Sequence, residues 1–279
     1  MTSRVFETML ARYECQSTED KLNAIREVMQ QVTLAALSRG GFFNKAAFYG
    51  GTCLRIFHGL ERFSEDMDFS LLAEQPDFTL EPWFENIHRE FAQLNQKVDI
   101  SVKKKSIQST IHSAFLKSDT AQYQIKLERG RVINIKLEVD TTPPLSFDTE
   151  ENLLLLPYSF YTRTFTLPCL FAGKMHAFIF RNWLHRVKGR DWFDFEWYVR
   201  RGIPLHFSHF AERAYQFDSV PRDSLSPDVL RNILKEKIES TPIEAVKKDV
   251  SPFLKNPSVM DIWSTRYFLQ LADMMVILG

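Results

Sequence analysis

Two aspartates separated by a single residue are the first group in this sequence that could do chemistry. Asp66 and Asp68 lie in the segment DMDFSL, which alternates polar and apolar residues as a β-strand does. Residues two apart on a strand point to the same side of the sheet, so both carboxylates face one way. Such a pair repels unless it is solvated or neutralised by cations. The pattern therefore indicates either a site for divalent metal ions or a solvated strand face.

A glycine turn precedes Asp66 by fifteen residues. A short predicted strand runs into Gly50-Gly51-Thr52, and a predicted helix over 53–58 follows. Free backbone N–H groups at the start of a helix favour an anion such as phosphate, and the Thr52 hydroxyl could cap the helix or donate to that anion. The same residues also occur in ordinary strand-to-helix turns. A chain can return from helix to strand within this distance, so we expect the turn beside the aspartates.

A third acidic segment, INIKLEVD over 133–140, alternates strictly. Its apolar residues share one face of a predicted strand, and its polar residues, which include Glu138 and Asp140, share the other. This strand can deliver a further carboxylate to the same metal site. Periodicity does not choose between Glu138 and Asp140, because both face the same way. An exposed polar strand face is the alternative interpretation.

A basic segment follows at 172–201, with seven Lys or Arg and three Asp or Glu, although the formal net charge of the chain is zero. It contains Lys174, Arg190 and Asp191. Cationic side chains of this kind contact triphosphate oxygens or an RNA backbone. The lysines at 103–105 form a second basic stretch. A solvated basic helix with internal ion pairs has the same composition and is the alternative.

The elements that must position these groups divide the chain into two parts. Residues 1–165 are expected to form a mixed α/β domain with N-terminal helices, and residues 166–279 a helical domain. We predict an α+β fold with a mixed β-sheet. Apolar periodicity predicts helices over 21–38, 53–58, 80–96, 167–182, 191–201, 206–216, 226–239 and 257–276. Alternation predicts strands over 46–49, 66–71, 98–103, 114–117, 123–127 and 133–140.

Composition limits the other function classes. The three cysteines, Cys15, Cys53 and Cys169, form no C-x-x-C pair, so neither a disulfide framework nor a cysteine-based zinc site is predicted. Scattered thiols fit the reducing cytoplasm, where we expect the protein. No run of about 18 apolar residues occurs, so no membrane-spanning helix is expected. His206 and His209 look exposed and have no third ligand nearby, which argues against a zinc hydrolase.

Taken together, three segments resemble the AbiEii/AbiGii-type nucleotidyltransferase toxins of bacterial abortive-infection and type IV toxin–antitoxin systems, which include the MenT-type toxins. They are GGTCLRIFHGLERFSEDMDFSL, INIKLEVDTTPP and KMHAFIFRNWLHRVKGRDWFDF. The resemblance covers about residues 48–201 and leaves the last third of the chain without a matching motif. It implies the nucleotidyltransferase core of the DNA-polymerase-β-like superfamily, followed by a helical C-terminal region.

The resemblance also implies a role for each motif residue. Nucleotide binding would involve Gly50, Gly51, Thr52, Ser64, Lys174 and Arg190. Two divalent ions, Mg²⁺, would be held by Asp66, Asp68 and Glu138. The implied catalytic residues are Asp66, Asp68, Glu138, Asp140, Lys174 and Asp191, with Asp140 as the alternative third acid.

The activity implied is magnesium-dependent transfer of nucleotides from an NTP to RNA, with the 3′ acceptor end of tRNA as the implied acceptor. A cognate antitoxin is the implied protein partner. Nucleotidylation of a protein, or another phosphoryl transfer at the same site, is the first alternative. A non-catalytic binding module whose carboxylates are structural is the second.

Overall fold

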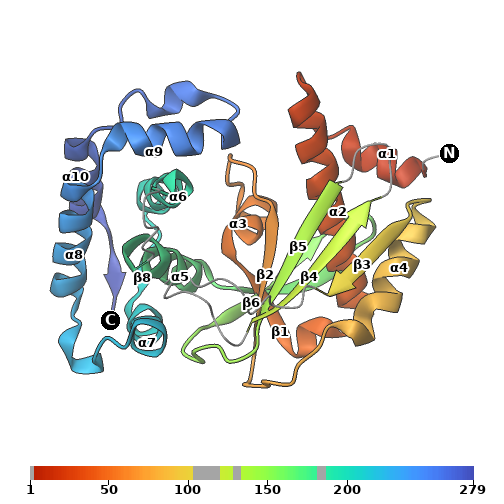
Figure 1. Cartoon of the computed structure of the whole chain (residues 1–279), viewed down its shortest axis with the longest axis horizontal. Helices are drawn as coiled ribbons and strands as arrows, with labels where there is room; N and C mark the ends of the chain where they lie inside the picture. The colour runs from red at the N-terminus through yellow and green to blue at the C-terminus, as the bar shows by residue number, and fades with distance from the viewer. Residues whose placement is uncertain (1–2, 103–119, 128–132, 181–186) are drawn as a thin grey trace, which may run out of the picture.

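The computed structural model of the chain describes residues 3–102, 120–127, 133–180 and 187–279. Within these residues, a seven-stranded sheet lies in one half of the molecule and the later helices gather in the other half, as Figure 1 shows. This arrangement confirms the predicted α+β fold with a mixed sheet and a helical C-terminal region. The division into two domains at residue 165 stays a prediction.

The sheet has the strand order β3-β4-β5-β2-β1-β7-β6. Its strands are β1 Ala46–Tyr49, β2 Asp66–Leu71, β3 Val98–Val102, β4 Thr120–Leu127, β5 Ile133–Asp140, β6 Thr149–Leu154 and β7 Phe160–Phe165. The pairs β2–β5 and β1–β7 are parallel, and the other neighbours are antiparallel. Both acidic strands, β2 and β5, therefore lie side by side in the middle of the sheet.

The helices pack around the sheet and against one another. They are α1 Arg4–Leu10, α2 Thr18–Arg39, α3 Gly50–His58, α4 Phe84–Gln93, α5 Leu167–Phe180, α6 Gly189–Arg200, α7 Phe207–Asp218, α8 Pro227–Ser240, α9 Ile243–Val250 and α10 Thr265–Met274. Helix α2 contacts β5 and β7 and packs on α4, while α3 contacts β2 and α5. The short strands β8 Leu205–His206 and β9 Ile277–Leu278 pair separately.

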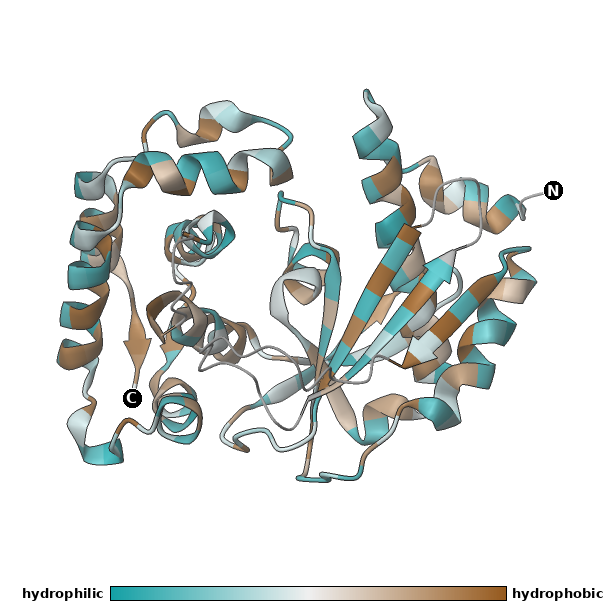
Figure 2. Ribbon diagram, in the orientation of Figure 1, coloured by the Kyte–Doolittle hydropathy of each residue, from teal (hydrophilic) through white to brown (hydrophobic). Residues whose placement is uncertain are grey.

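Alternation in β5 divides polar from apolar side chains. Ile135, Leu137 and Val139 have no exposed surface, whereas Lys136 and Glu138 on the opposite side stay partly exposed. Figure 2 shows the corresponding alternate bands of hydrophobic and hydrophilic residues along this strand. One side of the strand is thus fixed in the core, and the other is left for chemistry. None of the helices in the described part of the chain has the length and hydropathy of a membrane span.

Helix α3 begins three residues earlier than predicted. The predicted start is residue 53, but Gly50 is already helical in hydrogen bonding and has a φ of 83°. This left-handed conformation, which glycine adopts at little cost, lets strand β1 turn directly into the helix. Gly59, with a φ of 73°, ends the same helix as a left-handed C-cap.

Three later segments differ from the predictions. The hairpin of β6 and β7 was not predicted, because β6 is an edge strand whose residues are exposed or half-buried and show no apolar alternation. The single helix expected over 257–276 is wrong. The segment forms a short 3₁₀ helix followed by α10, which begins at Thr265 after the N-cap Ser264, whose side chain accepts a hydrogen bond from Tyr267 N. The helix α9 was also missed. The strand predicted over 114–117 lies outside the described residues.

Candidate active site

The glycine turn and the paired aspartates meet where β1 passes into α3. Tyr49 at the end of β1 is directly opposite Asp68 on β2. A Cβ atom on Gly50 would overlap the Asp68 carboxylate, so only glycine lets the backbone approach this side chain so closely. The first N–H groups of a helix have no partner within the helix, and here they lie beside an acidic group. The structure thus brings together the predicted phosphate turn and Asp68.

Strand register separates the two candidates for the third acid. Asp66 lies opposite Lys136, and Asp68 lies opposite Glu138. Asp140 lies one step further along, opposite Ser70, and is 3% exposed. Glu138 is therefore the acid beside Asp68, and Asp140 is buried at the far end of the strand.

Lys136, to which the sequence assigned no role, lies among the carboxylates of β2 and β5. Lys136 forms an ion pair with Glu138, whose carboxylate also accepts a hydrogen bond of 3.2 Å from Gln122 Nε2. Desolvation, together with the nearby Glu138 carboxylate, raises the pKa of Asp66, against the opposing charge of Lys136. Closely placed carboxylates without a bound cation repel, and this repulsion contributes to the shift. The ammonium of Lys136 partly supplies the positive charge that these acids require.

Thr52 lies inside this corner and does not present its hydroxyl to the site. The side chain is fully buried, and its hydroxyl donates to the backbone carbonyl of Asp66. This bond ties the first turn of α3 to the start of β2. For binding a phosphate, Thr52 retains its backbone N–H in the first helical turn.

A buried network of four charged side chains lies next to Gly51. Lys174 Nζ is 3.1 Å from Asp191 Oδ1 and 2.8 Å from Asp194 Oδ2. Asp194 in turn accepts two hydrogen bonds of 2.6 Å from Nε and Nη2 of Arg62. A Cβ on Gly51 would lie 2.8 Å from Arg62 Nη2, so the network reaches the glycine turn. The structure therefore places Lys174 and Asp191 beside the predicted phosphate site.

Asp194 is the centre of this network. Burial alone would raise the pKa of Asp194, but the charges and hydrogen bonds of Arg62 and Lys174 outweigh it and lower the pKa. Two cations and two carboxylates together are neutral, which is how such charges can be buried. Neither Arg62 nor Asp194 was predicted as a site residue. The available signal was that Asp194 shares a helix side with Asp191, three residues away.

Ser64 and Arg190 lie at the rim of the same corner. Ser64 Oγ would be 3.0 Å from a Cβ on Gly51. Arg190 stacks its guanidinium 4.2 Å from the centre of the Phe253 ring and lies 3.9 Å from Glu65. Its Nε is buried and has no hydrogen-bond partner among the described residues. Arg190 is therefore held by its stacking on Phe253 and by the nearby Glu65 carboxylate.

Some cations of the predicted basic surface fall outside the described residues. These are the lysines at 103–105 and the arginines at 181 and 186. Within the described residues, Arg62, Lys136, Lys174 and Arg190 are among the cations that lie at this corner.

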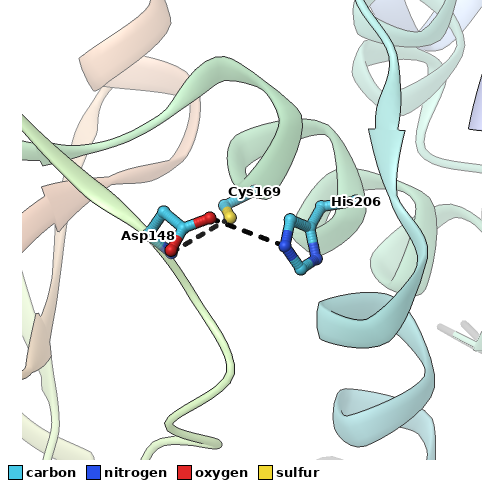
Figure 3. Close-up of side chains that lie close together, drawn as sticks. All are labelled: Asp148, Cys169 and His206. Atoms are coloured by element: carbon cyan, nitrogen blue, oxygen red, sulfur yellow. Dashed lines mark hydrogen bonds and ion pairs between the residues drawn. The ribbon is translucent and has the colours of Figure 1, made fainter. Parts of the chain in front are cut away.

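A separate cluster brings together Asp148 from the loop before β6, Cys169 from α5 and His206 from β8, which point toward one another in Figure 3. Across the described residues, these are the one trio of potential metal ligands with ligand atoms all within 4.8 Å of one another. His206 Nδ1 accepts a hydrogen bond from His209 N, so the neutral ring carries its proton on Nε2. Nε2 is the nitrogen that lies 3.6 Å from Asp148. The ring therefore offers no lone pair to a metal here.

The prediction that both histidines are exposed is wrong for His209, which is fully buried. His209 packs edge-on against the rings of Phe147 and Phe165. Burial lowers the pKa of His209 well below its ordinary value, and the charge of Arg213 adds to the effect. This histidine is a neutral core residue on α7.

The acids of β2 and β5 fit divalent cations by their chemistry. Asp66, Asp68 and Glu138 are carboxylates, the hard oxygen ligands that Mg²⁺ prefers, and they share one open side of two adjacent strands. Burial is the main cause of the raised pKa of Asp66, the neighbouring Glu138 carboxylate adds to it, and Lys136 offsets part of the acidic charge on this side. The first N–H groups of α3 and several cations lie next to these acids. The arrangement suits a reaction at a phosphate group.

Comparisons with known proteins identify the family. A sequence model of the nucleotidyl transferase AbiEii toxins of type IV toxin–antitoxin systems matches residues 32–271. No curated protein sequence matches the chain significantly.

Solved structures share the fold at low sequence identity. The nucleotidyltransferase toxin MenT4 of Mycobacterium tuberculosis has a TM-score of 0.56 at 17% identity, over 96% of this chain and 87% of its own. The JHP933 protein of Helicobacter pylori has a TM-score of 0.52 at 17% identity, over 93% of this chain and 91% of its own. The family model spans most of the sequence, and the chain therefore belongs to the AbiEii family of nucleotidyltransferase toxins of type IV toxin–antitoxin systems.

Proposed function

We propose that this nucleotidyltransferase transfers a nucleotide from an NTP to RNA, with the 3′ end of tRNA as the acceptor and Mg²⁺ as the metal. The observation that carries the proposal is the contact of Gly50 with Asp68, which joins a phosphate turn to an acidic strand pair. Nucleotidyl transfer needs both features at one place. The family assignment supports the reaction class, and the proposal extends it to substrate and metal.

The triphosphate is bound by the first turn of α3 and by nearby cations. The N–H groups of Gly50, Gly51 and Thr52 start the helix, where its dipole favours an anion. Lys174 and Arg190 supply positive charge at the same corner. Cations at these positions offset the charge that develops on the phosphates.

Asp66, Asp68 and Glu138 would hold the magnesium ions, and the register favours Glu138 over Asp140 as the third acid. When bound, two such ions lower the pKa of an attacking hydroxyl and stabilise a pyrophosphate leaving group. In the transfer, the acceptor oxygen forms a bond to the α-phosphorus, and the bond from that phosphorus to the β-phosphate oxygen breaks. The carboxylate of Glu138 would take the proton of the acceptor hydroxyl.

The toxin family supports a cognate antitoxin as the protein partner, and local charge supports RNA as the acceptor. A toxin of a two-gene system implies an antitoxin that restrains it, and the related fold of MenT4 belongs to a nucleotidyltransferase toxin. The local excess of basic residues around 172–201 supports a polyanionic acceptor. Both substrates are abundant in the cytoplasm, where we place the reaction.

The test incubates purified protein with each of the four α-labelled NTPs, Mg²⁺ and either purified tRNA, total RNA or total protein from cells. We expect label at the 3′ end of tRNA, and loss of labelling when Mg²⁺ is chelated. Label on protein alone would refute the RNA acceptor, and no label in any pool would refute the activity.

Two matched variants test the third acid in the same assay. Glu138→Gln should lower the rate by about 10³-fold or more, as expected for a lost metal ligand, because the metal contribution is several kcal/mol. Asp140→Asn should be much milder. The reverse order would assign the role to Asp140.

A further inference from the structure

Lys174 is connected to the glycine turn by an ion pair that is inaccessible to substrate. The side chain of Lys174 is 15% exposed, so its ammonium can meet a bound nucleotide. The side chain of Arg62 is 2% exposed and that of Asp194 is fully buried. Arg62 therefore cannot touch a ligand and acts only through its neighbours.

The geometry of Arg62 links three parts of the site. Its Nε and Nη2 each lie 2.6 Å from one oxygen of Asp194. This bidentate arrangement fixes the orientation of the guanidinium relative to the carboxylate. Its third nitrogen, Nη1, donates to the carbonyl of Phe63 at 3.0 Å, so the loop before β2 holds the arginine in place. The position of a Gly51 Cβ lies 2.8 Å from Nη2. The guanidinium thus packs directly against the glycine turn.

Asp194 connects Arg62 to Lys174. Its Oδ2 accepts from Arg62 and also lies 2.8 Å from Lys174 Nζ. Arg62, on the loop before β2, and Asp194, on α6, lie 132 positions apart in the sequence. Without Arg62, the buried carboxylate would lose one of its two cations and would be free to rotate toward Lys174 alone.

We propose that Arg62 is a positioning residue for the nucleotide: through Asp194, it fixes the Lys174 ammonium relative to the Gly50–Gly51 turn, so that both meet the triphosphate together. The proposal rests on the proposed function, because it takes an NTP as the ligand. Small displacements of a positioned charge cost a large share of its effect, so a looser Lys174 should bind phosphate less well.

If the Arg62–Asp194 ion pair only stabilised the fold, a different result would be expected. Such a role would lower the thermal stability of the protein, yet the fraction that stays folded would bind nucleotide normally. Nucleotide affinity of the folded protein is therefore the decisive measurement. Arg55 provides a matched control: it pairs with Glu27 at 2.9 Å and also holds the loop after α3 through the carbonyls of Leu60 and Glu61.

The experiment measures binding of the α,β-methylene analogues of ATP, CTP, GTP and UTP with Mg²⁺, by calorimetry at a temperature where circular dichroism shows each variant folded. We expect Arg62→Met to weaken binding of the preferred analogue roughly tenfold or more, and Arg62→Lys to recover part of that loss. Arg55→Met should stay within about twofold of the wild type, because it does not touch Asp194.

A double-mutant cycle tests whether Arg62 acts through Lys174. In a Lys174→Met background, Arg62→Met should cause little further loss, because the group that it positions is already missing. If Arg62→Met does not fold, Arg62→Lys replaces it in the same cycle. Equal binding by wild type and the Arg62 variants, or full independent losses in the cycle, would overturn the inference. Absence of binding by the wild type itself would instead refute the proposed NTP substrate.

Discussion

At the scale of single residues, two features restrict position 50 to glycine: its left-handed backbone and its close approach to Asp68. Alanine there costs about 1–2 kcal/mol for the left-handed backbone alone, and its Cβ would also overlap the Asp68 carboxylate. Gly59 is the matched control, since it has a similar positive φ and no atom within 4 Å of a Cβ. We expect both Gly50→Ala and Gly59→Ala to lower the melting temperature. Only Gly50→Ala should abolish nucleotide transfer; equal activity of the two variants would contradict the site.

Asp66 provides a second prediction at this scale. Its pKa is raised in the folded protein, so ionisation opposes folding, and the stability it contributes at low pH is lost as pH rises through that pKa. Asp66→Asn should therefore raise the melting temperature of the metal-free protein at pH 7 while abolishing turnover. It should also remove any stabilisation by Mg²⁺ with a non-hydrolysable NTP, because such stabilisation requires binding. A variant that is less stable and still active would disprove the assigned role.

At the scale of elements, α6 is held in position by α9. A Cβ on Gly189, the first residue of α6, would overlap the carbonyl oxygen of Val246 and lie 2.9 Å from Val250 N. Gly189 N also donates to Asp249 at 2.9 Å. Helix α6 carries Asp191 and Asp194, so the helical region without a recognised motif determines where these acids lie.

Two glycine variants test this packing. Gly189→Ala should lower the free energy of unfolding by about 1–3 kcal/mol, because the helices must move apart. Gly173→Ala in α5 meets no atom within 4 Å and should be neutral or stabilising by up to about 1 kcal/mol, because alanine favours a helix. Chemical denaturation of both variants checks the pair, and equal losses would rule out the packing explanation.

At the scale of the whole molecule, the candidate site lies where the sheet and the later helices meet. Arg62 pairs with Asp194, and Phe63 N donates to the carbonyl of Phe253 at 3.3 Å. Residues before β2 are thus bonded both to α6 and to the short turn after α9. The site depends on both halves, and we expect neither half to bind nucleotide alone.

Stability against acid is also a property of the whole molecule. His209 is neutral when folded, because burial lowers its pKa, whereas the unfolded chain binds a proton below about pH 6.5. The free energy of unfolding should therefore fall as pH drops below about 6.5, by up to about 1.4 kcal/mol per pH unit from this group. Urea titrations at pH 7, 6 and 5 should show a shallower decline for His209→Phe. His88→Gln, at an exposed position on α4, should leave the decline unchanged.

Short-range patterns in the sequence determined much of the fold and part of the site. The alternation of DMDFSL and INIKLEVD fixed two strands and the side on which their acids lie. The two glycines indicated the turn into α3, whereas the helix predicted from residue 21 begins three residues earlier, at Thr18, where Ser17 and Asp20 form a capping box. These features depend on neighbours within a few residues, so they are legible without any tertiary information.

Tertiary structure alone decided which of these groups meet. Placing β5 beside β2 put Glu138, and not Asp140, next to Asp68, because register depends on how whole strands pack. Tertiary packing also allows the Thr52 hydroxyl to donate a hydrogen bond to the carbonyl of Asp66. It likewise brings Arg62 into contact with Asp194, 132 residues away in the sequence. Periodicity shows which side of an element a residue occupies. It carries no information about which distant element will lie opposite, and that choice is made by burial of the shared core.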